Sequence, residues 1–127
     1  MTWRTGTMTA ITLIAILSME TIPRSWAAES GLSVQIQGKT LAFSRQKGNC
    51  LSCHEIDGGE LSGNIGPALV DLQLRYEDKA ALRAQIWDAT SRNHATGMPP
   101  YGRHRILTED EIDKIVKYIW SLQGQNR

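Results

Sequence analysis

Five consecutive residues restrict this chain more than any other feature. Residues 50–54 read Cys-Leu-Ser-Cys-His, the C-x-x-C-H pattern that is typical of covalent c-type haem attachment. Two thiols at this spacing can form thioethers with the two vinyl groups on one edge of a porphyrin. Histidine is a common proximal ligand of haem iron. The motif therefore predicts a fold built around haem, attached through Cys50 and Cys53 and with His54 bound to iron.

The same pentapeptide has two other interpretations. A C-x-x-C redox pair belongs in a thioredoxin-like βαβ unit, and the sequence shows no such strands. A structural zinc site needs four ligands, and no second C-x-x-C and no H-x₃₋₅-H pattern follows the motif. A chance match to so short a motif is the third alternative. An export signal argues against it, because bacteria attach covalent haem outside the cytoplasm.

Residues 1–27 have the features of such a signal. Arg4 supplies a positive start, residues 8–19 are apolar and uncharged, and Ser25 and Ala27 place small side chains at the two positions where a signal peptidase requires them. An apolar run of this length is too short to cross a bilayer, which takes about 20 residues. A retained membrane anchor is the alternative. We therefore expect a signal peptide, and then a periplasmic domain at residues 28–127 with no membrane span after cleavage.

Composition indicates a small domain that depends on a bound group. The chain has 14 Lys+Arg and 13 Asp+Glu, and this balance argues against non-specific binding of nucleic acid. Aromatic residues make up 6% of the chain, with a single Phe, so large side chains for a core are few. A domain of about 100 residues buries only about two-thirds of its extended-chain surface. A ligand inside the core would compensate for this deficit.

Helices are expected before and after the motif. The first is predicted over residues 39–47, with its end at Gly48, and the second over residues 78–91. A Gly- and Pro-containing loop is expected at residues 55–67. Residues 28–38 show a weak alternation of polar and apolar side chains, which predicts a short edge strand or an extended arm. Helices dominate, so the expected fold class is all-α.

The last predicted helix has the clearest start. Thr108 and Glu111 form a capping box, in which each side chain accepts a hydrogen bond from the backbone of the other residue. Apolar residues then recur at helical spacing, at Ile112, Ile115, Val116 and Ile119.

A methionine is the expected ligand on the other side of the iron. Met98 is the single methionine of residues 28–127 and stands in the loop sequence Thr-Gly-Met-Pro-Pro. A buried gap-filling role is the alternative. A rigid Pro-Pro segment can hold a thioether at iron with a small loss of entropy, and thioether ligation suits electron transfer. His94 and His104, which flank Met98, are the rival ligands.

A second group is expected to orient His54. Metal-bound imidazoles usually donate their other N–H to a fixed acceptor. The sequence Gly66-Pro67 follows the motif, and we expect the Pro67 carbonyl to accept from His54 Nδ1, with a plain loop turn as the alternative. Leu69 and Leu72 are expected to pack on the porphyrin.

The order of these motifs resembles the class I cytochrome c family. C-x-x-C-H, then Gly-Pro-x-Leu, then Met-Pro-Pro before a final amphipathic helix cover about residues 39–124. The resemblance implies a cytochrome c domain at residues 28–127, an all-α fold wrapped around one haem c with His and Met as axial ligands. It also implies that the terminal helices cross, with Gly48 and Tyr118 or Trp120 at the contact.

A narrower resemblance is to the SoxX family of monohaem cytochromes. It rests on residues 48–54, 63–67 and 98–108, with Met-Pro-Pro-Tyr-Gly-Arg-His as the most specific part; Tyr101 stands where that family is expected to have Phe. The resemblance implies an electron-transfer subunit that pairs with a SoxA-type cytochrome. Together they would conjugate thiosulfate to a cysteine of the carrier protein SoxYZ, an L-cysteine S-thiosulfotransferase reaction, and pass electrons to a small soluble acceptor.

This resemblance leaves no catalytic residue on the chain itself, because both cysteines are used as thioethers. A free-standing periplasmic electron carrier is an alternative that shares every haem feature. A haem enzyme or gas sensor needs an open sixth position, against which Met98 argues. Trp87 is expected in the core or as an interface anchor. Arg103 and His104 are expected near a haem propionate, at a partner or in solvent.

Overall fold

Three α-helices and three short 3-10 turns make up the regular structure within residues 24–123, which are the residues that the computed structural model describes. Most of the predicted signal peptide, residues 1–23, lies outside them. The helices are α1 (Arg24–Phe43), α2 (Lys79–Trp87) and α3 (Glu109–Trp120), and the 3-10 turns are η1 (Cys50–Ser52), η2 (Leu72–Leu74) and η3 (Ala89–Ser91). No strand occurs between residues 24 and 123, and the predicted all-α class is confirmed. None of the described helices is long and apolar enough to cross a membrane.

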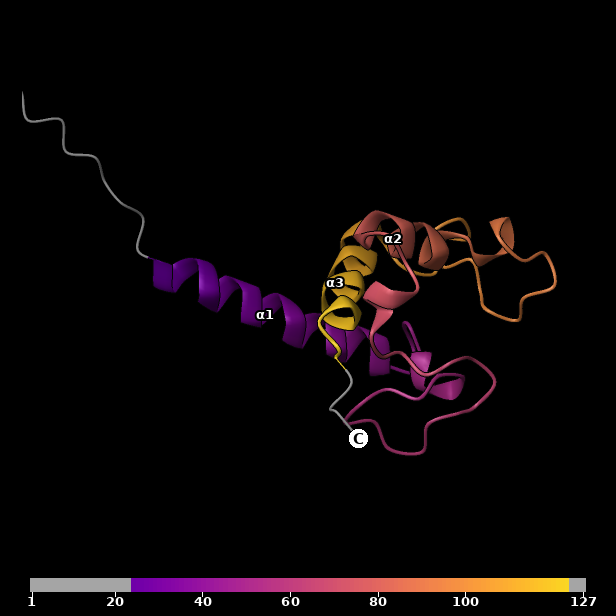
Figure 1. The fold of residues 1–127 in the computed structure, drawn as a ribbon, viewed down its shortest axis with the longest axis horizontal. Coiled ribbons are helices and arrows are strands. Elements are labelled where there is room, and N and C mark those ends of the chain that lie inside the picture. Colours follow the sequence, from indigo (N-terminus) through magenta and orange to yellow (C-terminus); the bar gives the residue numbers. More distant parts are fainter. Residues whose placement is uncertain (1–23, 124–127) are drawn as a thin grey trace, which may run out of the picture.

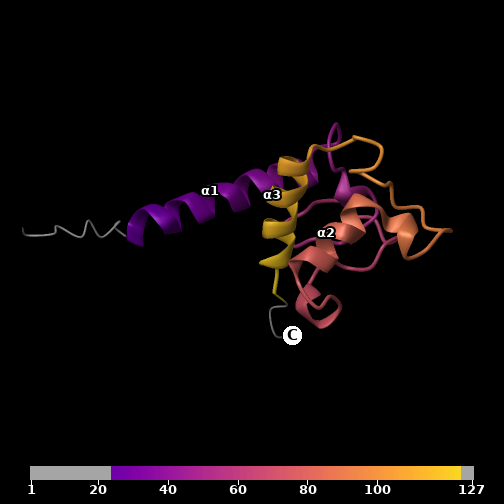
Figure 2. The same ribbon diagram turned by 90° about the horizontal axis from the view of Figure 1, so that it is seen from above.

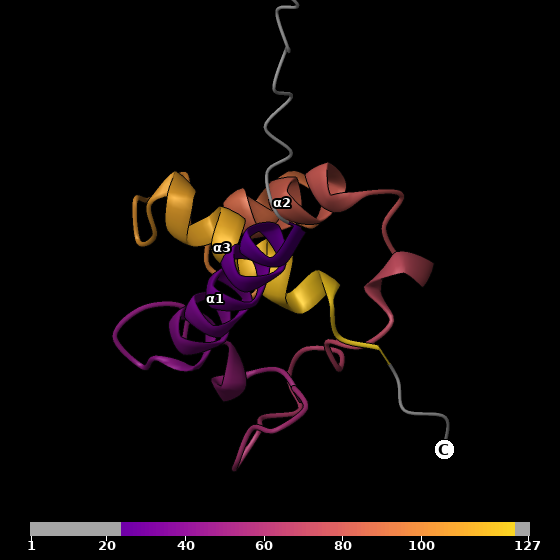
Figure 3. The same ribbon diagram turned by 90° about the vertical axis from the view of Figure 1, so that its left-hand side faces the viewer.

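The crossing of α1 and α3 organises the fold. α3 lies across the C-terminal part of α1, and the N-terminal part of α1 projects away from the rest of the molecule (Figures 1 and 2). Figure 3 looks nearly along α1 and shows α3 crossing behind it. At the crossing, a Cβ on Gly38 would overlap the backbone carbonyl of Lys114 and lie 2.8 Å from Tyr118 Cβ. The missing side chain of Gly38 therefore allows the two backbones to touch.

The predicted contact at the helix crossing is only half right. Tyr118 lies there, as expected, but the expectation for Gly48 is wrong. Gly48 follows α1 and packs against Leu41 and Ala42 of that same helix. The helix that crosses α3 uses Gly38 instead, one of several glycines that sequence alone does not distinguish.

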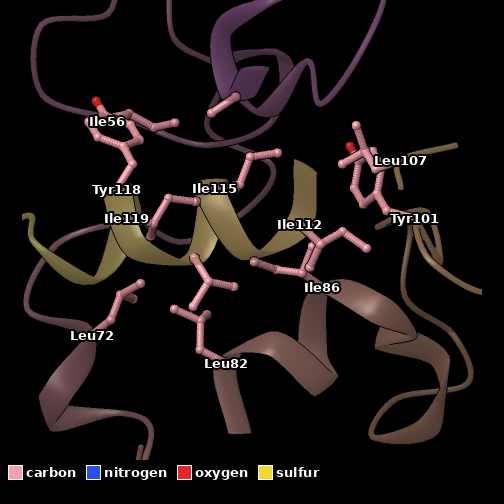
Figure 4. Packing of buried hydrophobic residues seen from close by; sticks show 12 residues of the cluster. Ile56, Leu72, Leu82, Ile86, Tyr101, Leu107, Ile112, Ile115, Tyr118 and Ile119 are labelled. Atoms are coloured by element: carbon pink, nitrogen blue, oxygen red, sulfur yellow. The ribbon is translucent and has the colours of Figure 1, made fainter. Parts of the chain in front are cut away.

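α3 contains the predicted capping box. Thr108 Oγ1 accepts from the Glu111 N–H at 3.2 Å, and a Glu111 carboxylate oxygen accepts from the Thr108 N–H at 2.9 Å. The other Glu111 oxygen pairs with Lys47 at 2.7 Å. The predicted apolar residues of this helix are all buried, namely Ile112, Ile115, Val116 and Ile119. Figure 4 shows Leu82 and Ile86 of α2 pointing toward α3 from the side opposite α1.

The prediction of an edge strand or extended arm at residues 28–38 is wrong, because α1 covers that whole segment. Leu32 and Ile36 are 60% and 59% exposed, so packing at these positions does not hold the helix. Helix formation is costly to nucleate but easy to extend, and the tight packing of this helix lies around Gly38 and Ala42. The alternation that suggested a strand also places Leu32 and Ile36 four residues apart, on one helical face.

Two predicted helices end earlier than expected. The first, expected to reach residue 47, ends at Phe43, and turns lead to Gly48, whose N–H donates back to the last turn of α1. The second, expected to reach residue 91, ends at Trp87. Asp88 leaves the helical conformation with φ of −151°, and its carboxylate caps the 3-10 turn that follows.

Replacing Gly38 by Ala tests the helix crossing. The added methyl group meets backbone atoms of α3 that cannot move aside, so we expect the free energy of unfolding to fall by about 1–3 kcal/mol. Gly31 is the matched control, since it lies on the same helix with nothing within 4 Å of its Cβ position. Gly31→Ala should be neutral or stabilise by up to about 1 kcal/mol. Equal effects in denaturant unfolding would contradict this account of the crossing.

The capping box makes stability depend on pH. The hydrogen bond from Lys47, together with that from the Thr108 N–H, lowers the pKa of Glu111. The stability that Glu111 contributes is therefore complete above the ordinary carboxylate pKa and lost as pH falls through the lowered pKa of the folded state. We expect the difference in unfolding free energy between wild type and Glu111→Gln to shrink from pH 7 toward pH 3. Asp110→Asn, which breaks an exposed ion pair with Lys114, should change stability less.

Candidate haem site

One cavity of about 250 Å³ brings together the residues that the sequence predicts for the site. Its wall draws on the C-x-x-C-H segment, the loop after it, η2, α2, the Met98 segment and α3. Six residues were expected in the site, and all six line this cavity: Cys50, Cys53, His54, Pro67, Leu69 and Met98. Leu72, expected to pack on the porphyrin, is in the wall as well.

The two cysteines stand on a tight turn. Asn49 opens the turn in the left-handed region, with φ of 46°, a conformation that asparagine tolerates better than most residues. The N–H groups of Cys53 and His54 both donate to the carbonyl of Cys50, at 3.2 and 2.9 Å. Both cysteines are half-buried. Burial raises the pKa of the Cys50 thiol to about 11, so without haem it stays protonated at neutral pH.

Two neighbouring residues fix the position of the His54 ring. Its Nδ1 lies 2.7 Å from the Pro67 carbonyl oxygen, which is the hydrogen bond predicted from the sequence. A carbonyl can only accept, so Nδ1 carries the proton and Nε2 keeps a free electron pair for a metal. A Cβ on Gly66 would also lie 2.5 Å from Nδ1, and the Gly66 N–H donates to the Cys53 carbonyl at 2.7 Å. The glycine and the proline carbonyl thus fix one orientation of the imidazole.

Met98 lies far from the C-x-x-C-H motif in the sequence and lines the same cavity. It is half-buried, and its N–H donates to Thr96 Oγ1 at 3.1 Å within the loop. Neither of the rival ligands, His94 and His104, is among the residues that line the cavity, and both are exposed. Of the three candidates for the sixth position, the structure therefore brings only Met98 to the wall that contains His54.

The chemistry of the wall fits a covalently attached haem. Two thiols, an imidazole nitrogen and a thioether sulfur are the groups that attach haem c and bind its iron. Much of the remaining surface is aliphatic, contributed by Leu69 and Leu72 and by residues of α2 and α3. Ile65 stands at the cavity and is 82% exposed, which leaves apolar surface beside the site.

Other lining residues were not predicted. Arg75 lies in the wall, where its Nη2 donates to the carbonyls of Ala68 at 2.5 Å and Val70 at 3.3 Å. Gln85 of α2 also lines the cavity, and no sequence motif marks either residue. Tyr101 lines it too, and burial raises the pKa of this phenol to about 12, so its hydroxyl keeps its proton. The position of Tyr101 directly after Met-Pro-Pro is the one sequence feature that could have placed it in the cavity.

Trp87 has a packing role in this structure. A Cβ on Gly102 would overlap the Trp87 indole, so the ring lies directly on that glycine. The Trp87 carbonyl accepts from the N–H groups of Gly102 and Arg103, at 3.1 and 3.2 Å. The Arg103 guanidinium pairs with Asp88 at 3.2 Å. Arg103 and His104 are both exposed, and neither lines the cavity.

Comparison with known proteins agrees with this site. The family model of cytochrome c matches residues 36–123, which is more than half of the chain. The chain belongs to the cytochrome c family. It is a c-type cytochrome that carries electrons, and its cofactor is covalently bound haem c. The range matched by the family model includes the C-x-x-C-H motif and Met98 of this cytochrome.

Two similar proteins add detail. An uncharacterized lipoprotein of Aquifex aeolicus is 35% identical over 75 residues, which cover 58% of this chain and 36% of that protein. The chain thus spans about a third of the length of this relative. A chain in the crystal structure of SoxXA from P. pantotrophus is 23% identical, with a TM-score of 0.63 over 71% of this cytochrome and 82% of that chain. At this identity the likeness shows the fold.

The glycine beside His54 offers a test of the site. In Gly66→Ala the new methyl group would overlap the imidazole and displace it from the Pro67 carbonyl, so we expect a severalfold lower yield of haem-containing protein. Gly97→Ala is the control, because it neighbours Met98 but has open space around its Cβ position. Haem stain per unit of protein measures the yield. Normal haem content and spectrum in Gly66→Ala would contradict the proposed packing of the ring.

Proposed function

We propose that this cytochrome is the electron-transfer subunit of a thiosulfate-oxidising complex of the SoxAX type. The observation that carries the proposal is the segment Met-Pro-Pro-Tyr-Gly-Arg-His at residues 98–104. Its methionine lines the same cavity as the C-x-x-C-H segment. The fold likeness to a chain of SoxXA supports it. Its partner would be a SoxA-type cytochrome, and the complex would act on the carrier protein SoxYZ.

In this proposal each predicted site residue has one task. Cys50 and Cys53 would form the thioethers, and His54 Nε2 and the Met98 thioether would bind the iron. Bound haem supplies a one-electron redox couple. The Pro67 carbonyl keeps the imidazole in one tautomer and strengthens it as a ligand. As the second protein ligand, Met98 would keep small molecules from the iron, and the centre would transfer electrons without binding substrate.

The chemistry of the complex divides between its subunits. Joining thiosulfate to a carrier cysteine makes an S–S bond, and it releases the thiol proton and two electrons. This chain has two cysteines, both assigned to haem, so the thiol belongs to the carrier and bond formation to the partner. A single haem accepts one electron at a time. The chain would therefore take the two electrons from the partner in successive steps and pass each to a small soluble acceptor.

We further propose that residues 1–27 are a signal peptide cleaved after Ala27, and that the cytochrome matures in the periplasm. The charge, length and small residues of that segment support this assignment. The intact mass of the haem protein from a periplasmic fraction tests it. A mass that begins at Ala28 and includes one haem is expected. A haem protein that retains residues 1–27 and stays with the membrane fraction would show a retained anchor instead.

Co-purification tests the proposed partnership. A tagged copy of the chain, recovered from cells grown on thiosulfate, should bring with it a second protein that stains for haem. Adding thiosulfate and the carrier protein to this complex should reduce its haem, whereas either addition alone should not. Recovery of the chain alone, together with unchanged growth on thiosulfate after deletion of its gene, would instead identify a free-standing electron carrier.

Met98→Ala tests the sixth ligand. The variant should lose the weak long-wavelength absorption band typical of Met-ligated ferric haem, bind carbon monoxide rapidly when reduced, and have a lower reduction potential. His94→Ala and His104→Ala serve as controls, because both side chains lie outside the cavity wall and should leave the spectrum unchanged. If a histidine variant, and not Met98→Ala, changed the spectrum, the ligand assignment would be wrong.

A further inference from the structure

The hydroxyl of Tyr101 joins two segments that are far apart in the sequence. Tyr101 is 8% exposed, and its hydroxyl donates to the carbonyl of Gly48 at 2.5 Å. Gly48 begins the turn that leads into Cys50, and Tyr101 comes directly after Met98-Pro-Pro. One buried hydrogen bond therefore connects the haem-attachment turn, which leads to His54, with the segment that carries Met98.

The Gly48 end of this bond cannot move freely. Gly48 is buried, and its N–H donates to the Leu41 carbonyl at 3.0 Å. Its Cβ position lies 3.0 Å from that carbonyl oxygen and 3.2 Å from Cys50 Sγ, so the backbone is enclosed on both sides. Within residues 24–123, the Tyr101 hydroxyl is the donor that the structure places on the Gly48 carbonyl. Removing it leaves a buried carbonyl without a partner, which costs free energy.

The backbone of Tyr101, at the other end of this hydrogen bond, is also held in place. Its own carbonyl accepts from the N–H groups of Ile106 and Leu107, at 2.9 and 3.1 Å, which fixes its backbone to the segment that leads into α3. Two prolines separate Tyr101 from Met98, and proline rings restrict the backbone φ angle. A shift of Tyr101 would therefore reach Met98 through a stiff connection, and a fixed Tyr101 holds Met98 in place.

We propose that the Tyr101 hydroxyl is a positioning group that latches the Met98 segment to the haem-attachment turn and so sets how often the Met98 thioether leaves the iron. This inference rests on the proposed ligation by Met98. The latch acts on ligand exchange and not on electron transfer itself. It makes the closed, six-coordinate centre persist, which suits a carrier that must not bind small molecules at its iron.

Cyanide binding to the ferric haem protein tests the latch. Cyanide must displace Met98, so the rate that saturates at high cyanide reports opening of the Met98 segment. Tyr101→Phe keeps the ring and removes the oxygen, and we expect opening about tenfold faster, the factor that corresponds to about 1.4 kcal/mol for one buried hydrogen bond. The long-wavelength band of Tyr101→Phe should also disappear on heating at a lower temperature than in wild type, while the helical signal persists.

Tyr118→Phe is a matched control within the same core. Tyr118 is 6% exposed, and its buried hydroxyl has no hydrogen-bond partner among the described residues. Removing that oxygen should leave the rate of cyanide binding unchanged. Equal acceleration in the two variants would overturn the latch, because loss of a buried hydroxyl in general would then explain it. A rate in Tyr101→Phe equal to that of wild type would overturn it too, even if unfolding became easier.

The wild-type spectrum separates failure of the latch from failure of the ligand assignment. A wild-type protein without the long-wavelength band would overturn ligation by Met98 and the latch with it. A wild-type protein that has the band, with equal opening rates in wild type and Tyr101→Phe, would overturn the latch alone.

Discussion

The hydrogen bond between His54 Nδ1 and the Pro67 carbonyl holds the imidazole at the cavity in one orientation. It assigns the ring proton to Nδ1 and leaves the Nε2 electron pair available for a metal, while Gly66 leaves room for the ring in this one orientation. The adjacent cysteines and Met98 line the same cavity as this oriented ring. The site is thus an arrangement around one oriented side chain, and other parts of the fold serve to hold its partners in place.

The haem cavity and the hydrophobic core are parts of one structure. Leu72, Leu82, Ile86, Ile115 and Ile119 belong to both the buried core and the cavity wall. Helices α2 and α3 therefore pack against each other and against the cofactor space with the same side chains. A group that binds the folded state stabilises it, so haem attachment and folding are coupled in this small domain. Large aromatic side chains are few in this chain, and a cofactor that fills part of the interior takes up the space that they would otherwise occupy.

Sequence predicted the local features and, through its motif, the place of Met98 in the cavity, and it missed contacts that no motif marks. The Thr108 cap and the Pro67 acceptor are set by residues at most 13 positions apart in the chain, and the structure contains both. The helix at residues 28–38 packs on α3 at Gly38, a tertiary contact that the local sequence pattern does not reveal. In the sequence, Tyr101 stands out only because the SoxX family is expected to have Phe at this position. Its hydrogen bond to a carbonyl more than fifty positions earlier cannot be inferred from its neighbours.

The most direct test of the account is proton NMR of the reduced haem protein. A methionine bound to low-spin ferrous haem lies against the porphyrin ring current, which shifts its methyl signal far upfield of the ordinary protein spectrum. We predict one three-proton signal in that region, lost in Met98→Leu. A reduced protein that contains covalent haem but lacks the signal, or keeps it in Met98→Leu, would contradict the claim that one cavity joins His54 and Met98 on a single iron.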